Sequence, residues 1–519
     1  MSQPLSIFTL ASFNLQNFNA ALKKEFHDTE VTSVDYEQMF PFLLNLKPAR
    51  SRPAPGGICI CWISMRDVFQ AKEMKMDLVE LILKLNQSFQ YSIVILPTFD
   101  SPAFNTFQGN SLRTELYKLN LALSEKTIGT NIAVLDPAAW MVQQGNNSVS
   151  SSLWYLSKTP FHKNIFKLAA DACKSTLNAF TGNSKKILIV DLDDTLWGGI
   201  VGDDGLENLK IGGHDAIGEA FADFQRWIQM IKSWGVILCI CSKNDEKIAL
   251  EVFEKHSGMI LKKEDFVKLR INWNDKAANI VEMVKEVNVA MDAVVFLDDN
   301  PAERERIRTA LPEILVPNLP EDKMEYPAFI RSLNCFNRIA ITDEDKNRTE
   351  LYQDEEKRTH SYDTFPSVED WIASLKIEMN FEELNDSNLV RAEQLLNKTN
   401  QMNLRTRRMS KEELKTWAAK KDHWFYVVHV KDVFGDNGIT GLLGFHKTEK
   451  NEIFIDDFVM SCRVMGRNIE DKILEFVVNV AKENTCTRVI AESVTTEKNK
   501  PVLDFFTNQN LDNDFLFLS

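Results

Sequence analysis

The segment KKILIVDLDDTL at residues 185–196 joins a short aliphatic run to a group of carboxylates. The run from Ile187 to Val190 is typical of a strand that is buried on both faces of a parallel sheet. In an open parallel sheet, ligands bind outside the carboxyl ends of the strands. We therefore expect Asp191 and Asp193 to reach one pocket, where one carboxylate can attack or bind a metal ion while the other transfers protons. Taken alone, the segment also fits a strand that is followed by an acidic turn.

Three further segments follow in chain order. The apolar run VILCIC ends at Ser242, and the later run AVVFL is followed by Asp298 and Asp299. Between these runs, Lys276 opens a helix-like stretch that reads KAANI. A lysine in such a place is usually solvated, so only its position among the other segments makes it a candidate site residue.

These four segments, in this order, resemble the motifs of the haloacid dehalogenase (HAD) superfamily. The resemblance implies that Asp191 is a nucleophile that forms an aspartyl-phosphate and that Asp193 is the general acid and base. It further implies that Ser242 binds a phosphoryl oxygen and that Lys276 offsets negative charge. Phosphoryl transfer requires this kind of charge neutralisation.

The same resemblance implies a bound Mg²⁺ ion. Magnesium prefers oxygen ligands and retains several waters, so one or two carboxylates suffice to hold it. By resemblance, the ligands are Asp191, Asp298 and the backbone carbonyl of Asp193, whereas Asp299 lies farther from the ion.

The segment after Thr195 contains a glycine-rich flap, WGGIVGDDGLENLKIGG, and one helix-like stretch at about 216–232. The segment between Ser242 and Lys276 is shorter still. HAD enzymes that act on small molecules usually carry a cap domain in one of these places, so this core resembles the capless members. An uncovered site favours a large or protein-borne substrate, unless another domain closes over it. Candidate flap and phosphate-site residues are Thr195, Gly198, Gly199 and Asn244.

Four longer motifs narrow the resemblance to FkbH-like proteins. They are the flap, CSKND at 241–245, FLDDNPAERE at 296–305 and NKTNQMNLRTRR at 397–408. FkbH-like enzymes are associated with taking a glyceryl group from 1,3-bisphosphoglycerate, removing its phosphate and loading the acyl group on an acyl carrier protein. By resemblance, Cys241 could carry that acyl group as a thioester. The alternative is a buried structural cysteine, which is the common role of this residue.

Residues 1–160 predict an α/β domain, with strands at 58–63, 92–96 and 131–135 and helices at about 77–87 and 110–123. By position this domain resembles the SGNH-hydrolase-like domain of longer FkbH-like proteins. Its nucleophile region reads LASFNLQN, which retains Ser12 and Asn14 but lacks the Gly and Asp of that family, and no Asp-x-x-His follows near its end. We therefore expect no hydrolase chemistry here, and we expect a docking or carrier-recognition role.

An amphipathic helix at 161–184 is expected to open the HAD-like core, which we place at 161–335, and a charged helical connector is expected at 336–366. Residues 367–519 resemble a GNAT acyltransferase domain. Its loop Arg463-Val464-Met465-Gly466-Arg467-Asn468 resembles the loop that binds the pyrophosphate of coenzyme A at a helix start, except that Asn468 replaces a small residue. The resemblance implies coenzyme A or phosphopantetheine binding through Arg463, Gly466, Asn468 and Asn499. A plain strand–helix turn is the alternative.

The composition fits a multidomain α/β enzyme. The chain has 519 residues, 44% of them hydrophobic, and a net charge of −14, which argues against nucleic acid or an anionic membrane as a partner. The eight cysteines form no metal-binding pattern, no apolar run reaches about 18 residues, and no leader-like segment opens the chain, so we expect a cytoplasmic protein. Two other functions remain open: a simple phosphatase on a small phosphate ester, and a non-catalytic biosynthetic assembly protein.

Overall fold

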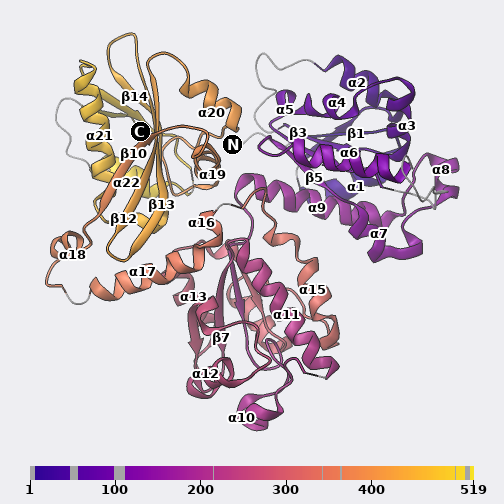
Figure 1. The fold of residues 1–519 in the computed structure, drawn as a ribbon, viewed down its shortest axis with the longest axis horizontal. Helices are drawn as coiled ribbons and strands as arrows, with labels where there is room; N and C mark the ends of the chain where they lie inside the picture. Colours follow the sequence, from indigo (N-terminus) through magenta and orange to yellow (C-terminus); the bar gives the residue numbers. More distant parts are fainter. Residues whose placement is uncertain are drawn as a thin grey trace. The chain divides into compact units, whose positions relative to one another are not determined.

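The computed structural model describes residues 6–27, 29–46, 57–98, 112–213, 215–341, 343–362, 365–496, 498–508 and 515–518. The chain divides into two compact units, residues 1–180 and residues 181–519 (Figure 1). Unit 1 contains one parallel sheet, and unit 2 contains one parallel and one largely antiparallel sheet. The protein is therefore a mixed α/β protein, as the sequence predicts.

The sheet of unit 1 has five parallel strands in the order β2-β1-β3-β4-β5. The predicted strands are confirmed within about one residue as β3 (Gly57–Trp62), β4 (Tyr91–Ile95) and β5 (Ile132–Leu135). Two strands were not predicted, namely β1 (Ser6–Ala11) and β2 (Glu30–Ser33). The helices are α1 (Gln16–Glu25), α2 (Met39–Asn45), α3 (Met65–Glu73), α4 (Leu78–Leu83), α5 (Leu85–Ser88), α6 (Leu112–Lys126), α7 (Ala138–Gln144), α8 (Ser151–Ser157) and α9 (Lys163–Thr181).

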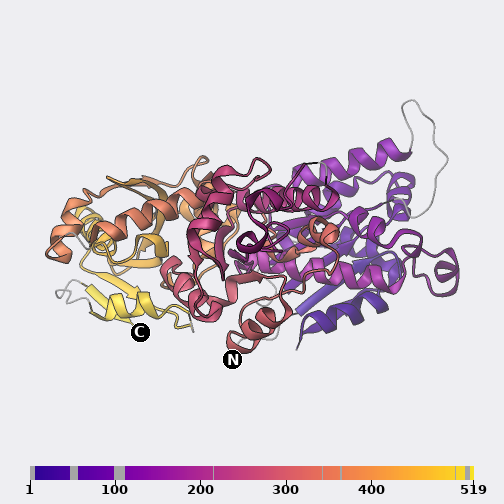
Figure 2. The same cartoon turned by 90° about the horizontal axis from the view of Figure 1, so that it is seen from below.

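Helices cover both faces of this sheet (Figure 2). Alternate residues of β3 supply the two cores, with Ile58 and Ile60 on one face and Cys59 and Cys61 on the other. We expected the helix at 161–184 to open the second domain. Instead, the buried face of α9 packs in the core of unit 1. Its apolar side chains lie in the same hydrophobic core as Ile58 and Ile60 of β3.

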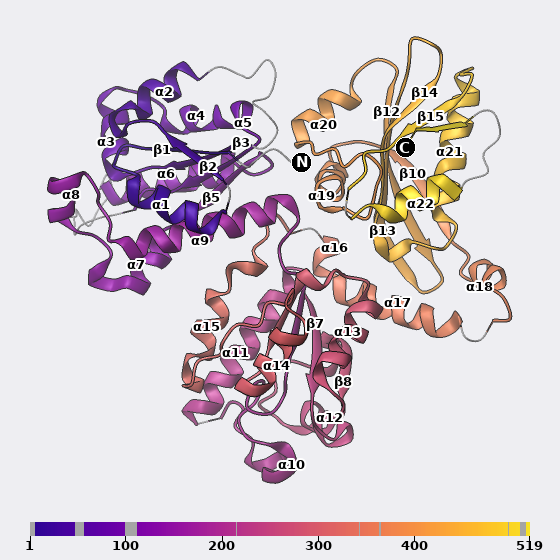
Figure 3. The same ribbon diagram turned by 180° about the vertical axis from the view of Figure 1, so that it is seen from behind.

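The parallel sheet of unit 2 has the strand order β8-β7-β6-β9. Its strands are β6 (Ile187–Val190), β7 (Ile237–Ser242), β8 (Phe266–Ile271) and β9 (Val294–Leu297). One face is covered by α11 (Ala216–Ser233), α12 (Glu246–Lys255) and α15 (Tyr326–Ser332), and the other by α13 (Lys276–Val287) and α14 (Pro301–Ala310) (Figure 3). Between β6 and β7 lie only the flap, the short α10 (Val201–Asp204) and α11, so the described residues there form no separate cap.

The second sheet of unit 2 has the order β10-β12-β13-β14-β15-β16, and the two-residue β11 (Met402–Asn403) pairs with β14. Its longer strands are β10 (Glu378–Glu383), β12 (His423–Asp432), β13 (Gly435–Lys447), β14 (Ile453–Met460), β15 (Val489–Glu492) and β16 (Phe515–Leu518). It is packed against α19 (Leu389–Lys398) and α20 (Lys411–Ala418) on one side and α21 (Ile469–Glu483) and α22 (Lys500–Asn508) on the other.

The charged segment after the parallel sheet forms α16 (Asp343–Lys346), α17 (Arg348–Tyr362) and α18 (Val368–Ser374). The sequence predicts a charged helical connector here. Within it, Arg358 is buried and forms an ion pair with buried Asp432 of β12, with Nε and Oδ2 2.7 Å apart. Gln353 donates to the carbonyl of Glu264 on the other side. Helix α17 therefore joins the two sheets into one unit. No helix among the described residues is long and apolar enough to cross a membrane.

Candidate active site

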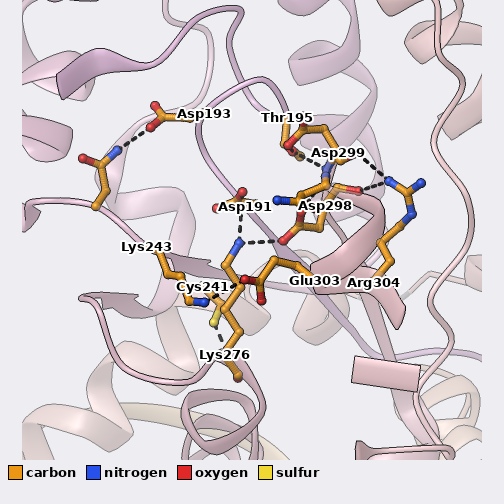
Figure 4. Close-up of polar contacts among 12 residues, drawn as sticks. Asp191, Asp193, Thr195, Cys241, Lys243, Lys276, Asp298, Asp299, Glu303 and Arg304 are labelled. Atoms are coloured by element: carbon orange, nitrogen blue, oxygen red, sulfur yellow. Dashed lines mark hydrogen bonds and ion pairs between the residues drawn. The ribbon is translucent and has the colours of Figure 1, made fainter. Parts of the chain in front are cut away.

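The predicted site residues of unit 2 meet at the carboxyl edge of the parallel sheet. Asp191 follows β6, Ser242 ends β7, Asp298 follows β9, and Lys276 is the first residue of α13. The amide of Asp191 donates to the carbonyl of Leu297 at 2.9 Å, which extends the pairing of β6 and β9 by one residue, to Asp191. Figure 4 shows Asp191 and Asp298 directed at the amine of Lys276.

Lys276 bridges the two carboxylates. Its Nζ lies 2.6 Å from Oδ2 of Asp298 and 3.1 Å from Oδ2 of Asp191, and all three side chains are at least 90% buried. Burial raises the pKa of Asp191 and of Asp298, and the Lys276 charge opposes that rise. Burial would lower the pKa of Lys276, but the two carboxylates outweigh it and hold the pKa above its ordinary value. The lysine is therefore a fixed cation.

The carboxylates of Asp191, Asp298 and Asp299 can form a cation site. One oxygen from each lies within 4.8 Å of the others. Among the described residues, Oδ1 of Asp191 is buried without a hydrogen-bond partner, and a buried unpaired carboxylate oxygen is costly unless a ligand satisfies it. An all-oxygen set of this size fits Mg²⁺, which keeps waters for its remaining positions. The carboxylate of Asp299 belongs to this group, and the expectation that it lies farther from the ion stays a prediction.

Asp193 faces the flap rather than Lys276. Its Oδ1 accepts from Nε1 of Trp197 at 2.9 Å and from the amide of Val201 at 3.2 Å, and its Oδ2 accepts from Nδ2 of Asn244 at 2.9 Å. Burial raises the pKa of Asp193, and the hydrogen bond from Trp197 opposes that rise. A raised carboxyl pKa suits a general acid and base. The ligand role predicted for the backbone carbonyl of Asp193 stays a prediction.

The flap is fixed by its glycines and by Thr195. Gly198 exchanges backbone hydrogen bonds with Lys210, and a Cβ at Gly198 would lie 2.7 Å from Cε2 of Phe221. Gly199 has a φ of +98°, which side chains rarely adopt. The Thr195 hydroxyl accepts from the amide of Asp299 at 2.9 Å. These residues therefore shape the site. Their predicted contact with a phosphate group stays a prediction.

Two cations of the site were not predicted. Nη1 of Arg304 donates to the carbonyls of Asp298 and Asp299 at 2.8 and 2.7 Å. Nζ of Lys323 donates to the carbonyl of Asp194 at 2.7 Å and lies 3.6 Å from Oδ2 of Asp299. Arg304 had a sequence signal, since it lies one turn into the helix that follows Asp298. Lys323 had none, because the fold brings it to the site from 24 residues beyond Asp299.

Cys241 does not have the surroundings of a nucleophile. Its side chain is fully buried in the core between β7 and α13, and its Sγ lies 3.8 Å from the carbonyl of Lys276. Burial raises the pKa of Cys241 to about 12, mainly because a thiolate would be desolvated. The described conformation therefore gives Cys241 a packing role, and Cys239 has the same burial.

The residues expected to bind coenzyme A in unit 2 are engaged in contacts within the protein. The amide of Gly466 donates to Oε1 of Glu470 at 2.8 Å, so a carboxylate lies where a pyrophosphate was expected. Asn499 is fully buried and donates to the carbonyls of Asn403 and Val494. Nε of Arg463 donates to the Ser461 hydroxyl, and Asn468 is the N-cap residue before α21, with a φ of +58°. These contacts correspond to the structural alternative, a strand–helix turn.

No protein-family model matches the chain, and no curated protein matches it. A solved structure from Bacteroides fragilis, the N-terminal part of a protein described as containing a phosphatase domain complexed with Mg, is 28% identical with a TM-score of 0.59. The match covers 66% of this chain and 96% of that one. The chain thus shares the fold of a solved protein with a phosphatase domain over about two thirds of its length.

Two acetyltransferase structures match a smaller part of the chain. A GNAT-family enzyme from Staphylococcus aureus is 14% identical with a TM-score of 0.21, covering 26% of this chain and 87% of that one. An acetyltransferase from Bacillus anthracis in complex with acetyl coenzyme A is 15% identical with a TM-score of 0.18, covering 25% and 81%. Scores this low do not establish a shared fold.

The cation site predicts a specific stabilisation by Mg²⁺. Because a ligand that binds only the folded state stabilises it, added MgCl₂ should raise the melting temperature of unit 2 in wild-type protein and leave Asp298→Asn unchanged. The control Asp223→Asn alters an exposed carboxylate on α11 and should respond like wild type. Differential scanning calorimetry measures both. An equal Mg²⁺ response in Asp298→Asn would contradict the site.

Removing Lys276 should make stability depend more strongly on pH. In metal-free Lys276→Met, two buried carboxylates with raised pKa lose their counter-charge, which should cost about 3–5 kcal/mol of unfolding free energy at pH 7. Acids whose folded pKa exceeds the unfolded value lose stability as pH rises above the unfolded value. The deficit should therefore shrink between pH 7 and pH 5 in urea titrations. Lys243→Met removes a part-exposed lysine paired with Glu303 and should show no such trend.

Proposed function

We propose that the protein is a HAD-type, Mg²⁺-dependent phosphatase that works through a phosphoryl group on Asp191. The observation that carries the proposal is the unpartnered Oδ1 of Asp191, held beside Lys276, Asp298 and Asp299 at the carboxyl edge of a parallel sheet. The structural likeness to a protein whose phosphatase domain was solved with Mg supports it.

In this proposal each residue has one task. Lys276 holds Asp191 by Oδ2, which leaves Oδ1 free to attack phosphorus. The negative charge on the phosphoryl oxygens is stabilised by Lys276 and by Ser242, which lies at the end of β7. Mg²⁺, when bound by the three carboxylates, supplies further positive charge for the same purpose. Asp193 protonates the leaving oxygen and then takes a proton from the water that hydrolyses the aspartyl-phosphate.

Replacement of Asp191 and replacement of Asp193 should affect phosphate release in different ways. With acetyl phosphate and Mg²⁺, Asp191→Asn should lose phosphate release to background, because no carboxylate remains to form the intermediate. Asp193→Asn should slow release about 10²–10⁴-fold, and intact-mass measurement should detect an accumulated phosphoenzyme. The control Asp203→Asn, in the exposed part of the flap, should keep its turnover. Unchanged release by Asp191→Asn would contradict the proposal and favour a non-catalytic assembly role.

The narrower activity implied by the FkbH-like resemblance is removal of phosphate from 1,3-bisphosphoglycerate with transfer of the glyceryl group to an acyl carrier protein. The support for it is the lack of a cap among the described residues between Thr195 and Ser242, which leaves room for a protein-borne group. The burial of Cys241 does not support a covalent thioester on that residue. In our proposal the carrier thiol therefore bonds to C1 of 1,3-bisphosphoglycerate as the C1 phosphate leaves, and Asp191 then removes the phosphate at C3. The alternative, a simple phosphatase, requires neither a carrier protein nor an acyl transfer.

Intact-mass measurement separates these two versions. We expect that incubation with 1,3-bisphosphoglycerate, Mg²⁺ and a phosphopantetheinylated carrier protein adds a glyceryl mass to the carrier. We also expect Cys241→Ala to retain this loading, since its thiol is buried. Loading lost in Cys241→Ala, with phosphate release intact, would restore the thioester role. A carrier that never gains mass while acetyl phosphate is hydrolysed would leave only the simple phosphatase.

A further inference from the structure

Lys323 joins the turn that leads into the flap to the proposed metal site. Its Nζ donates to the carbonyl of Asp194 at 2.7 Å and lies 3.6 Å from Oδ2 of Asp299. Asp194 follows Asp193 in the turn, whereas Asp299 belongs to the carboxylate group that can hold a cation. One ammonium group therefore contacts both the turn that carries Asp193 and a candidate ligand of Mg²⁺.

Contacts with the core of unit 2 hold Lys323 in this place. Lys323 is the first residue of a short 3₁₀ helix, η6 (Lys323–Glu325), which the side chain of Asp322 caps. Its Nζ also donates to the phenol oxygen of Tyr326 at 2.9 Å. Tyr326 is buried, and its ring packs edge-on against Phe221 of α11. A lysine ammonium is usually solvated and mobile, whereas this one is directed at the site.

The turn that Lys323 contacts has an uncommon backbone conformation. Asp194 has a φ of +52°, in the left-handed region that a residue with a side chain rarely adopts. Such a conformation persists only where the surrounding structure determines it. The amide of Gly199 donates to Oδ1 of Asp194 at 3.2 Å, and Lys323 binds the carbonyl of the same residue. Because Asp193 directly precedes Asp194, contacts that fix this turn also fix the direction of the Asp193 carboxyl.

The backbone of Asp299 is held independently of Lys323. Its amide donates to the Thr195 hydroxyl at 2.9 Å, and its carbonyl accepts from Nη1 of Arg304 at 2.7 Å (Figure 4). Loss of the Lys323 ammonium should therefore leave Asp299 in place. It should remove only a positive charge that lies 3.6 Å from the Asp299 carboxylate. A positive charge in that place repels a second cation that binds to the same carboxylate.

We propose that Lys323 is a positioning residue with two opposite effects on the site, an inference that rests on the phosphatase function proposed above. By holding the carbonyl of Asp194, Lys323 directs Asp193 toward the leaving oxygen and the attacking water. By its charge beside Asp299, Lys323 weakens the binding of Mg²⁺. The same ammonium group therefore improves the alignment of the general acid and base and lowers the affinity for the metal ion.

Replacement of Lys323 by methionine keeps a long stem and removes the charge and the donor. In full-length Lys323→Met, kcat for acetyl phosphate at saturating Mg²⁺ should fall about tenfold to a hundredfold, since a misplacement of about 1 Å can cost that much. Titration calorimetry should show Mg²⁺ binding that is about tenfold tighter, the effect of removing a unit charge about 6 Å from a divalent ion in a water-like medium. General damage to the site would weaken both.

A double-mutant cycle distinguishes positioning of Asp193 from any other effect on turnover. In the Asp193→Asn background, Lys323→Met should cause no further loss of kcat, because its effect on kcat acts through Asp193. Mg²⁺ binding should still become tighter in that background. The matched control Lys185→Met removes a lysine whose Nζ also donates to a backbone carbonyl, at the amino edge of the same sheet. Both quantities should keep their wild-type values in this control.

A second variant, Lys323→Ala, should show the same two changes, with melting curves confirming that both variants are folded. Unchanged kcat or weaker Mg²⁺ binding in the folded variants would overturn the inference, as would a full further loss of kcat in the Asp193→Asn background. Wild-type protein that releases no phosphate would instead contradict the proposed function. Because calorimetry measures Mg²⁺ binding without turnover, the two failures are distinguishable.

Discussion

The buried ion pairs from Lys276 to Asp191 and Asp298 are the constraint on which the site of unit 2 depends. Two carboxylates at the ends of neighbouring strands would repel each other in a dry environment, and each would favour its neutral form. One lysine at the start of α13 offsets part of that repulsion from 2.6 and 3.1 Å. Part remains, because the pKa of both carboxyls stays raised. The protein thus keeps a local excess of negative charge that a divalent cation can neutralise.

The register of the parallel sheet fixes the positions of the two aspartates. Strand β6 is central, and its register with β9 sets Val190 beside Leu297, so the next residue of each strand is an aspartate. The flap then turns Asp193 away from Lys276 and toward Trp197 and Asn244. Two carboxylates that are separated by one residue therefore occupy different surroundings. In the proposed mechanism, this difference in surroundings lets Asp191 act as the nucleophile and Asp193 exchange protons.

Sequence patterns predicted the parts of the molecule that depend on local order. Short β-branched runs gave the strands, and residues at their carboxyl ends gave Asp191, Ser242 and Asp298. Lys323 could not be predicted, because its approach to Asp194 follows from the packing of a distant turn. The sequence left open whether Cys241 is buried or reactive, and burial proved to be the answer. The contact of Gly466 with Glu470 could not be predicted, since periodicity does not tell which polar groups find partners inside the protein. The same reason explains Arg358, a residue of a charged helix whose partner lies 74 residues away.

The most direct test of the central claim is a crystal structure of the protein soaked with Mg²⁺ and beryllium fluoride, which mimics a phosphoryl group bonded to a carboxylate. The account predicts a beryllofluoride group on Oδ1 of Asp191, with Lys276 against it and one Mg²⁺ held by Asp191, Asp298 and Asp299. A beryllofluoride on another residue, or a Mg²⁺ that binds without contact to either aspartate, would contradict it.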